Sequence, residues 1–218
     1  ASIDGARALL AARGPELLGR LLALVEEARR RLRELPGVLV PGPGDFPAGR
    51  FDPAKLVLVL AGGGASGIDV ERDLLRADIP VEMADRDTLV PVVTLADTVD
   101  TVARLVDALS AAVRRHRGAP RPLTVAPQWT SAAVAAMTPR DAFFADHETV
   151  PGAAAVGRVC AEVVAPYPPG VPVLVPGEVV TAGALASLRA ARAAGTRIAY
   201  AADPTLDTLQ VVTRSFTE

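Results

Sequence analysis

The sequence predicts an α/β (α+β) protein with a long N-terminal helix, a small mixed-sheet α/β domain and a second small α/β domain at the C-terminus. Two long stretches carry apolar residues at helical spacing, and several short apolar runs bounded by Gly or Pro indicate strands. A linker-like segment, RGAPRP, lies at 117–122. We therefore expect two domains, 1–118 and 119–218. Half of the 218 residues are apolar, which is enough for two cores.

The leading helix is expected over residues 2–35, with a break near Gly14-Pro15. Its second part has leucine and valine at helical spacing and ends at Pro36-Gly37. The rest of the first domain is predicted as strands 38–40 and 56–61, helix 67–76, strands 81–84 and 89–95, and a helix from Asp97 to about Arg115. The run LVLVLA at 56–61 is typical of a strand buried on both faces, and Asp97 is a good helix N-cap.

In the second domain, Thr138 followed by Asp141 predicts a capped short helix over 139–146. Five prolines within 163–178 exclude a helix there and allow only short or edge strands. Thr181 is expected to begin a helix that ends at Gly195. Two closing strands are predicted at 197–201 and 209–212.

The bulk composition excludes several classes. The net charge of −2 provides no basic stripe for a nucleic acid. No uninterrupted apolar run is long enough for a membrane span. The single cysteine, Cys160, fits a reducing cytoplasm, and its apolar neighbours favour a buried residue over a reactive thiol.

A glycine cluster with the spacing Gly62-x-Gly64-x-x-Gly67 follows a predicted strand and opens a predicted helix. Together with Glu82 or Asp85 it imitates a dinucleotide fingerprint, so nucleotide binding is one alternative. The acidic residues come 15 to 18 positions after the last glycine, and no second mononucleotide-binding half follows. Such turns are also common for backbone reasons alone, which favours a structural role.

Other chemical sites are poorly supported. His116 and His147 are 31 positions apart without a cysteine partner, so both are interpreted as surface residues and no metal site is expected. Lys55 is the only lysine, and its place at the start of a strand favours a solvent-facing residue over a Schiff base.

The sequence leaves the roles of several carboxylates open. Glu82, within IPVEMAD, either faces solvent or recognises a cation. Arg158 and Glu162 are spaced for an ion pair, and Glu178 follows a Pro-Gly turn where it can accept backbone N–H groups. Structural roles are expected for these last three residues.

One long segment resembles a known family. GRVCAEVVAPYPPGVPVLVPGE at 157–178 is similar to a characteristic string of the ornithine/lysine/arginine decarboxylases. TPRDAF at 138–143, with Glu148 and Val150-Pro151, resembles the piece that precedes it. FDPAKL, the glycine cluster and VEMAD also look like family segments, so the resemblance covers nearly the whole chain.

The resemblance implies a fold-type I enzyme that uses pyridoxal phosphate (PLP) to decarboxylate arginine, lysine or ornithine. Residues 1–118 would be its small domain and 119–218 its C-terminal domain. The family holds PLP on a lysine that follows a histidine, and no His-Lys pair occurs here. The cofactor domain is therefore expected to precede Ala1, leaving no catalytic residue in this chain and no activity of the chain alone.

The resemblance also implies that Glu82 recognises the distal cation of the substrate and that the protein is a homo-oligomer. The single cysteine favours a cytoplasmic protein. Tyr167 and Glu178 look like residues of fold-defining turns. The alternative is a stand-alone binding or regulatory protein of the same fold.

Overall fold

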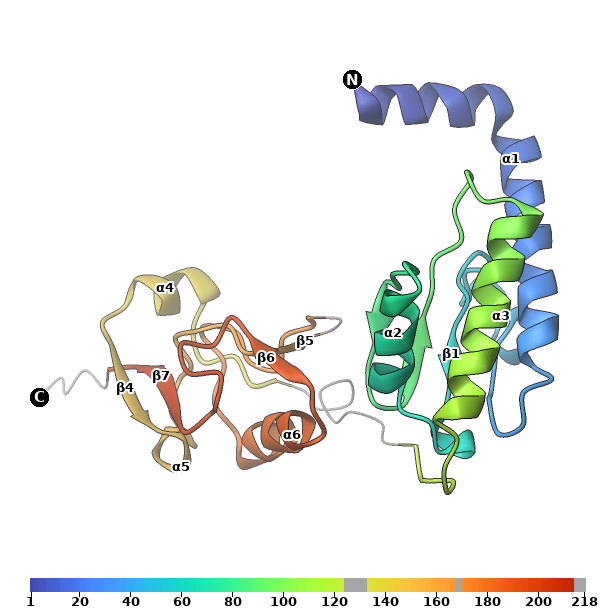
Figure 1. Ribbon diagram of the computed structural model, residues 1–218. Coiled ribbons are helices and arrows are strands. Elements are labelled where there is room, and N and C mark those ends of the chain that lie inside the picture. Colours follow the sequence, from blue (N-terminus) through green and yellow to red (C-terminus); the bar gives the residue numbers. More distant parts are fainter. Residues whose placement is uncertain (124–132, 168–169, 214–218) are drawn as a thin grey trace, which may run out of the picture. The chain divides into compact units, whose positions relative to one another are not determined.

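The computed structural model describes residues 1–123, 133–167 and 170–213 (Figure 1). The chain divides into two compact units, one within Ala1–Leu123 and the other within Thr124–Glu218. The α/β class, with a long leading helix and small sheets, is confirmed. The assignment of 1–118 and 119–218 to two named domains stays a prediction.

Helix α1 (Ser2–Leu32) is continuous and contains Pro15. Proline has no N–H to donate, and its ring crowds the carbonyl four residues earlier, so a helix bends at this residue. Figure 1 shows the bend in the first half of α1, where a break was predicted. Beyond the bend, α1 places one apolar face in the core: Leu17, Leu21, Val25, Ala28 and Leu32.

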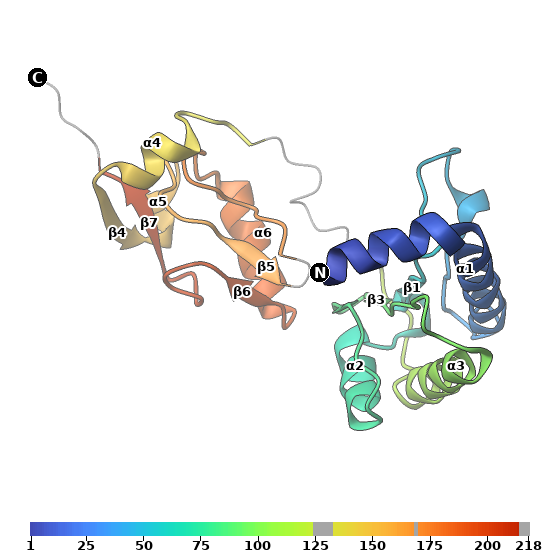
Figure 2. The ribbon, with the colours of Figure 1, turned by 90° about the horizontal axis from the view of Figure 1, so that it is seen from above.

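The sheet of the first unit has the order β1-β3-β2, with β1 (Leu58–Val59), β2 (Met83–Ala84) and β3 (Thr88–Val90). Both pairings are antiparallel, so the prediction of a mixed sheet was wrong in strand direction. The predicted strand at 38–40 is only a bridge from Leu39 to Val59. Helices α2 (Gly67–Arg76) and α3 (Val99–Arg115) complete the unit, and α3 contacts both α1 and α2 (Figure 2).

The apolar run before the glycine cluster alternates in burial. Leu56, Leu58 and Leu60 are fully buried, whereas the two valines between them are only partly buried. The expectation of a strand buried on both faces was therefore wrong, and the period of two follows from the strand geometry. Truncating any one of these leucines to alanine would cost about 2–5 kcal/mol of stability.

The start of α3 differs by one residue from the prediction. Thr98 is the N-cap, and its side chain accepts the N–H of Thr101. Asp97 instead accepts the N–H and hydroxyl of Thr94 at 2.7 and 2.9 Å, and the hydroxyl of Thr101 at 2.8 Å. Both residues thus organise the turn before α3, but only Thr98 caps the helix.

The second unit is built from two short antiparallel strand pairs. Its elements are α4 (Pro139–Phe144), β4 (His147–Pro151), α5 (Gly152–Ala155), β5 (Ala165–Tyr167), α6 (Ala182–Ala193), β6 (Arg197–Ala199) and β7 (Thr208–Val212). β4 pairs with β7 and β5 with β6. The expected caps are confirmed: Thr138 and Thr181 accept N–H groups of the first turns of α4 and α6, and Gly195 has a φ of 94° just after α6.

The loop between β6 and β7 is organised by one carboxylate. Asp203 accepts the N–H and hydroxyl of Thr205 at 2.8 and 2.6 Å, and the N–H and hydroxyl of Thr208 at 2.9 and 3.0 Å. The Thr205 hydroxyl, followed by the two backbone N–H groups, holds the pKa of Asp203 well below its usual range.

No helix among the residues that the structure describes combines the length and apolar content needed to cross a bilayer.

We expect Asp203→Ala to destabilise the protein at pH 7, because it removes an acceptor shared by four donors. The folded pKa lies below the unfolded value of about 3.9, so this contribution is fully present above that pH and disappears as the pH falls. The difference in melting temperature between the wild type and the variant should therefore begin to shrink below about pH 4 and keep shrinking as the pH falls toward the lower folded pKa. A difference in melting temperature that stays constant from pH 7 to pH 3 would contradict this role of Asp203. Asp4→Ala, at an exposed position of α1, is the control.

Candidate functional site

A buried guanidinium holds the loop that leads to the candidate site. Arg29, on α1, is only 1% exposed. Its Nε donates to Pro41 O at 3.0 Å, and its Nη2 donates to Pro53 O and Lys55 O, each at 3.1 Å. It also pairs with Glu26 one helical turn earlier. A buried charge must be paired and hydrogen-bonded to be tolerated, and Arg29 meets this requirement with carbonyls of the loop.

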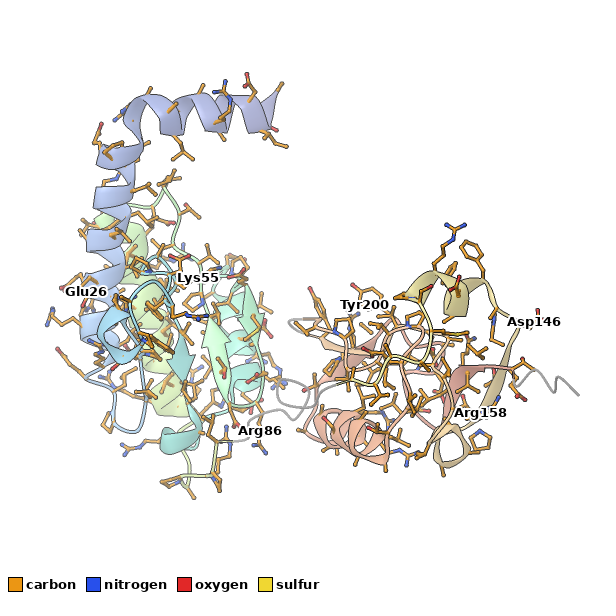
Figure 3. The ribbon with its side chains drawn as sticks, turned by 180° about the vertical axis from the view of Figure 1, so that it is seen from behind. Glu26, Lys55, Arg86, Asp146, Arg158 and Tyr200 are labelled. Carbon is orange, nitrogen blue, oxygen red and sulfur yellow. The ribbon has the colours of Figure 1, made fainter. Side chains whose placement is uncertain are left out.

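The FDPAK segment is a turn that places Lys55 immediately before Leu56, the first buried leucine of the apolar run that leads into β1. Asp52 accepts the N–H of Ala54 on its Oδ1 at 2.9 Å, and its carbonyl accepts the N–H of Lys55 at 3.1 Å. The backbone of Lys55 is therefore held on both sides, by Asp52 and by Arg29. Its side chain is 44% exposed, and Figure 3 labels it beside the leading helix.

Glu82 lies across the sheet from this turn and precedes β2. Its N–H donates to Val90 O at 2.9 Å, which fixes its backbone against β3. The Lys55 Nζ donates to Glu82 Oε2 at 2.7 Å, and the Glu82 side chain is 47% exposed. An ion pair between such half-exposed groups contributes at most about 1 kcal/mol. Glu82 is therefore half exposed and pairs with a lysine of its own unit, and its recognition of a substrate cation stays a prediction.

The glycine cluster serves backbone packing. Gly64 has a φ of 74°, and a Cβ on it would lie 2.4 Å from the Gly118 carbonyl carbon. The Arg121 guanidinium donates to the carbonyls of Gly64 and Ala65 at 2.6 and 2.7 Å, and to Asp87 Oδ1 at 3.0 Å. The chain's own residues thus fill the turn where a phosphate would have to bind.

The start of α2 is closed in the same way. The Gly67 N–H donates to Arg86 O at 3.1 Å. A Cβ on Gly67 would lie 2.3 Å from Asp85 O and 2.6 Å from Thr88 O. The helix N-terminus therefore contacts the β2–β3 hairpin, and the geometry does not support a pyrophosphate at Gly62–Gly67.

The remaining candidates have structural contacts. His116 Nε2 lies 2.9 Å from Asp73 Oδ2, which links the end of α3 to α2, and His147 is exposed at the start of β4. Within the described ranges, no three His, Cys, Asp or Glu side chains gather as a metal site would require. Cys160 is fully buried, and this burial raises the pKa of its thiol to about 11.

The expected pair of Arg158 and Glu162 does not form. Arg158 donates to Glu148 Oε1 at 2.7 Å and to Val212 O at 2.9 Å, and Figure 3 labels it near β7. Glu162 is 7% exposed and accepts the N–H groups of Ala202 and Gln210, each at 2.7 Å. The spacing of four residues predicts a pair only on a helix, and this segment is not helical.

Glu178 has the predicted role, because its Oε2 accepts the N–H of Val175 at 3.0 Å across the Pro-Gly turn. No local pattern indicated the roles of Arg29 and Arg121, since each lies in an arginine-containing polar stretch like several others.

The described residues do not fit PLP. The only lysine, Lys55, is engaged by Glu82. The one glycine-rich turn that opens a helix is filled by Arg121 and by backbone of its own unit. No step of a reaction is therefore assigned to PLP on these residues.

We expect Gly67→Ala to lower the free energy of unfolding by about 1–3 kcal/mol, because the new methyl group would overlap two backbone carbonyls. Gly19→Ala is the matched control: it lies inside α1 with no atom within 4 Å of the added carbon, so it should stabilise the protein by up to about 1 kcal/mol. Urea unfolding of both variants measures the difference. A neutral Gly67→Ala would argue against the close packing described above.

Comparison with known proteins agrees with the resemblance. Residues 124–198 match the family described as "Orn/Lys/Arg decarboxylase, C-terminal domain". The chain is 35% identical over 217 residues to an arginine decarboxylase of Halalkalibacterium halodurans and 33% identical over 223 residues to one of Bacillus subtilis. Each alignment covers 97% of this chain and 44% of the relative, so the chain spans less than half the length of these curated relatives.

Solved structures show the same fold. A lysine decarboxylase of Francisella novicida superposes with a TM-score of 0.71 at 18% identity, over 92% of this chain and 40% of that one. The constitutive lysine decarboxylase of E. coli gives 0.72 at 19% identity, over 97% and 43%. Over nearly its whole length the chain is therefore similar to arginine decarboxylases, and residues 124–198 match the C-terminal domain of the Orn/Lys/Arg decarboxylase family.

Proposed function

We propose that residues 1–218 are the C-terminal part of a PLP-dependent decarboxylase of a basic amino acid, and that they complete its substrate pocket. The observation that carries the proposal is the alignment of 97% of the chain with arginine decarboxylases at 31–35% identity. Arginine is the substrate that we favour, because the curated relatives at 31–35% identity are arginine decarboxylases.

Glu82 is the residue that we assign to substrate recognition. A carboxylate forms strong, charge-assisted hydrogen bonds with an ammonium or a guanidinium. Glu82 is open to solvent, its backbone is fixed on the sheet, and an ammonium already lies 2.7 Å from it. These contacts support a carboxylate suited to the distal cation of arginine.

The cofactor would be bound by a part of the enzyme other than residues 1–218. This proposal agrees with the sole lysine being paired with Glu82 and with the relatives being more than twice as long as the matched region. A homo-oligomer in the cytoplasm belongs to the same proposal, and the single buried cysteine fits a reducing compartment.

In the complete decarboxylase, we expect Glu82→Gln to lower kcat/KM for arginine by about tenfold to a hundredfold. The variant keeps the shape of the side chain and loses the charge, and each factor of ten corresponds to about 1.4 kcal/mol of binding. Glu34→Gln removes an exposed carboxylate just after the end of α1 and serves as control. Unchanged kcat/KM in the Glu82 variant would remove this residue from the pocket.

For residues 1–218 on their own, we expect no release of CO₂ from arginine, lysine or ornithine in the presence of PLP. Borohydride treatment followed by mass analysis should find no PLP adduct on Lys55, because the glycine-rich turn that could have held a phosphate is filled by Arg121 and by backbone of its own unit. A stable adduct on Lys55, or measurable CO₂, would show that this part of the chain is a PLP enzyme in its own right.

A further inference from the structure

The one lysine of the chain occupies the carboxylate that we assign to the substrate. We infer that Lys55 is an internal competitor at Glu82: its ammonium binds the carboxylate in the free protein and leaves it when the cation of the substrate binds. This inference rests on the proposed role of Glu82 in substrate recognition. It adds a second residue that sets the affinity for the substrate without contacting the reacting atoms.

The chemistry of the two cations makes them alternatives. Lys55 presents to Glu82 the same kind of group that a basic amino acid carries at its distal end, a positive charge with N–H donors. It bonds one carboxylate oxygen, Oε2, at 2.7 Å. The guanidinium of arginine is a planar fork that donates to both oxygens of a carboxylate at once. The guanidinium of arginine can therefore replace a single ammonium at Glu82.

The anchoring of Lys55 confines this exchange to its side chain. The carbonyl of Lys55 accepts a hydrogen bond from the buried Arg29 at 3.1 Å, and its N–H donates to Asp52 O at 3.1 Å. The backbone therefore stays in place while the four-carbon stem can rotate. Displacement of the ammonium requires no rearrangement of the turn or of the sheet.

Because both side chains of the pair are partly exposed, their separation costs little free energy. The side chains of Lys55 and Glu82 are 44% and 47% exposed, so water can solvate the ammonium as soon as it leaves. Ion pairs of this kind weaken a competing ligand by at most about fivefold. Lys55 therefore lowers the affinity of Glu82 for a substrate cation only slightly, and the carboxylate stays accessible to that cation.

The test uses the complete decarboxylase and compares two variants of opposite expected sign. Lys55→Met removes the competing charge and should lower KM for arginine by up to about fivefold, with the effect in KM and not in kcat. Lys55→Arg supplies a competing guanidinium and should raise KM. A merely structural ion pair predicts the reverse order, because arginine would preserve it and methionine would abolish it.

The Glu82→Gln background shows whether the effect passes through the carboxylate. There, Lys55→Met should no longer lower KM, since no carboxylate remains to compete for. A KM that is unaltered by both lysine variants, or a gain from Lys55→Met that persists beside Glu82→Gln, would overturn the inference. Melting temperatures check that every variant is folded.

The two proposals can fail separately. If Glu82→Gln lowers kcat/KM but the Lys55 variants keep the wild-type KM, Glu82 recognises the substrate and Lys55 does not compete. If Glu82→Gln leaves kcat/KM unchanged, the proposed recognition role is wrong, and the role of Lys55 falls with it.

Discussion

Arg29 is the contact on which the candidate site depends. A guanidinium that is 1% exposed must have its donors satisfied, and here loop carbonyls supply the acceptors together with Glu26. Its hydrogen bonds join the leading helix to Pro41, Pro53 and Lys55, three points of the segment between α1 and the sheet. Because another conformation of this segment would leave N–H donors of the buried guanidinium without acceptors, the arrangement seen here is strongly favoured. The position of Lys55 opposite Glu82 follows from it.

Arg121 likewise holds irregular backbone with its guanidinium, at the glycine cluster that precedes α2. It donates to the carbonyls of Gly64 and Ala65 within the glycine cluster, and it pairs with Asp87, which is 5% exposed. The core of this unit is made of Leu, Val and Ala, side chains that pack without polar contacts, so the irregular segments are fixed largely by guanidinium groups. A planar cation with five donors is well suited to collect several carbonyls that no strand satisfies.

The parts of the fold that sequence reasoning recovered depend on local chemistry. The spacing of apolar residues located α3 and the buried half of α1, and Thr181 and Gly195 marked the two ends of α6. The choice between Asp97 and Thr98 as the cap of α3 depended on where the Thr94 hydroxyl lies, which no pattern reveals. Strand β4 was missed because its residues are mostly exposed and its partner β7 lies some sixty positions away.

The site itself was only half predictable. The family resemblance pointed to Glu82, but its partner is 27 positions away on another element, and no spacing rule joins the two. Arg29 could not be singled out from the sequence, because it lies in a run of similar charged residues, of which it alone is buried. Long-range pairs of polar side chains are decided by the complete fold, whereas helix caps and apolar faces are decided within a few residues.

The fixed backbone and free tip of Lys55 also have a kinetic consequence. Rotamer changes of exposed side chains take picoseconds to nanoseconds, whereas loop and domain closure take microseconds or longer. Enzymes of ordinary speed turn over in milliseconds to a second. In the role that we propose for Glu82, the paired and unpaired states of Lys55 would therefore interconvert many times before a ligand reacts or dissociates. The exchange of Lys55 would then never limit the rate of binding.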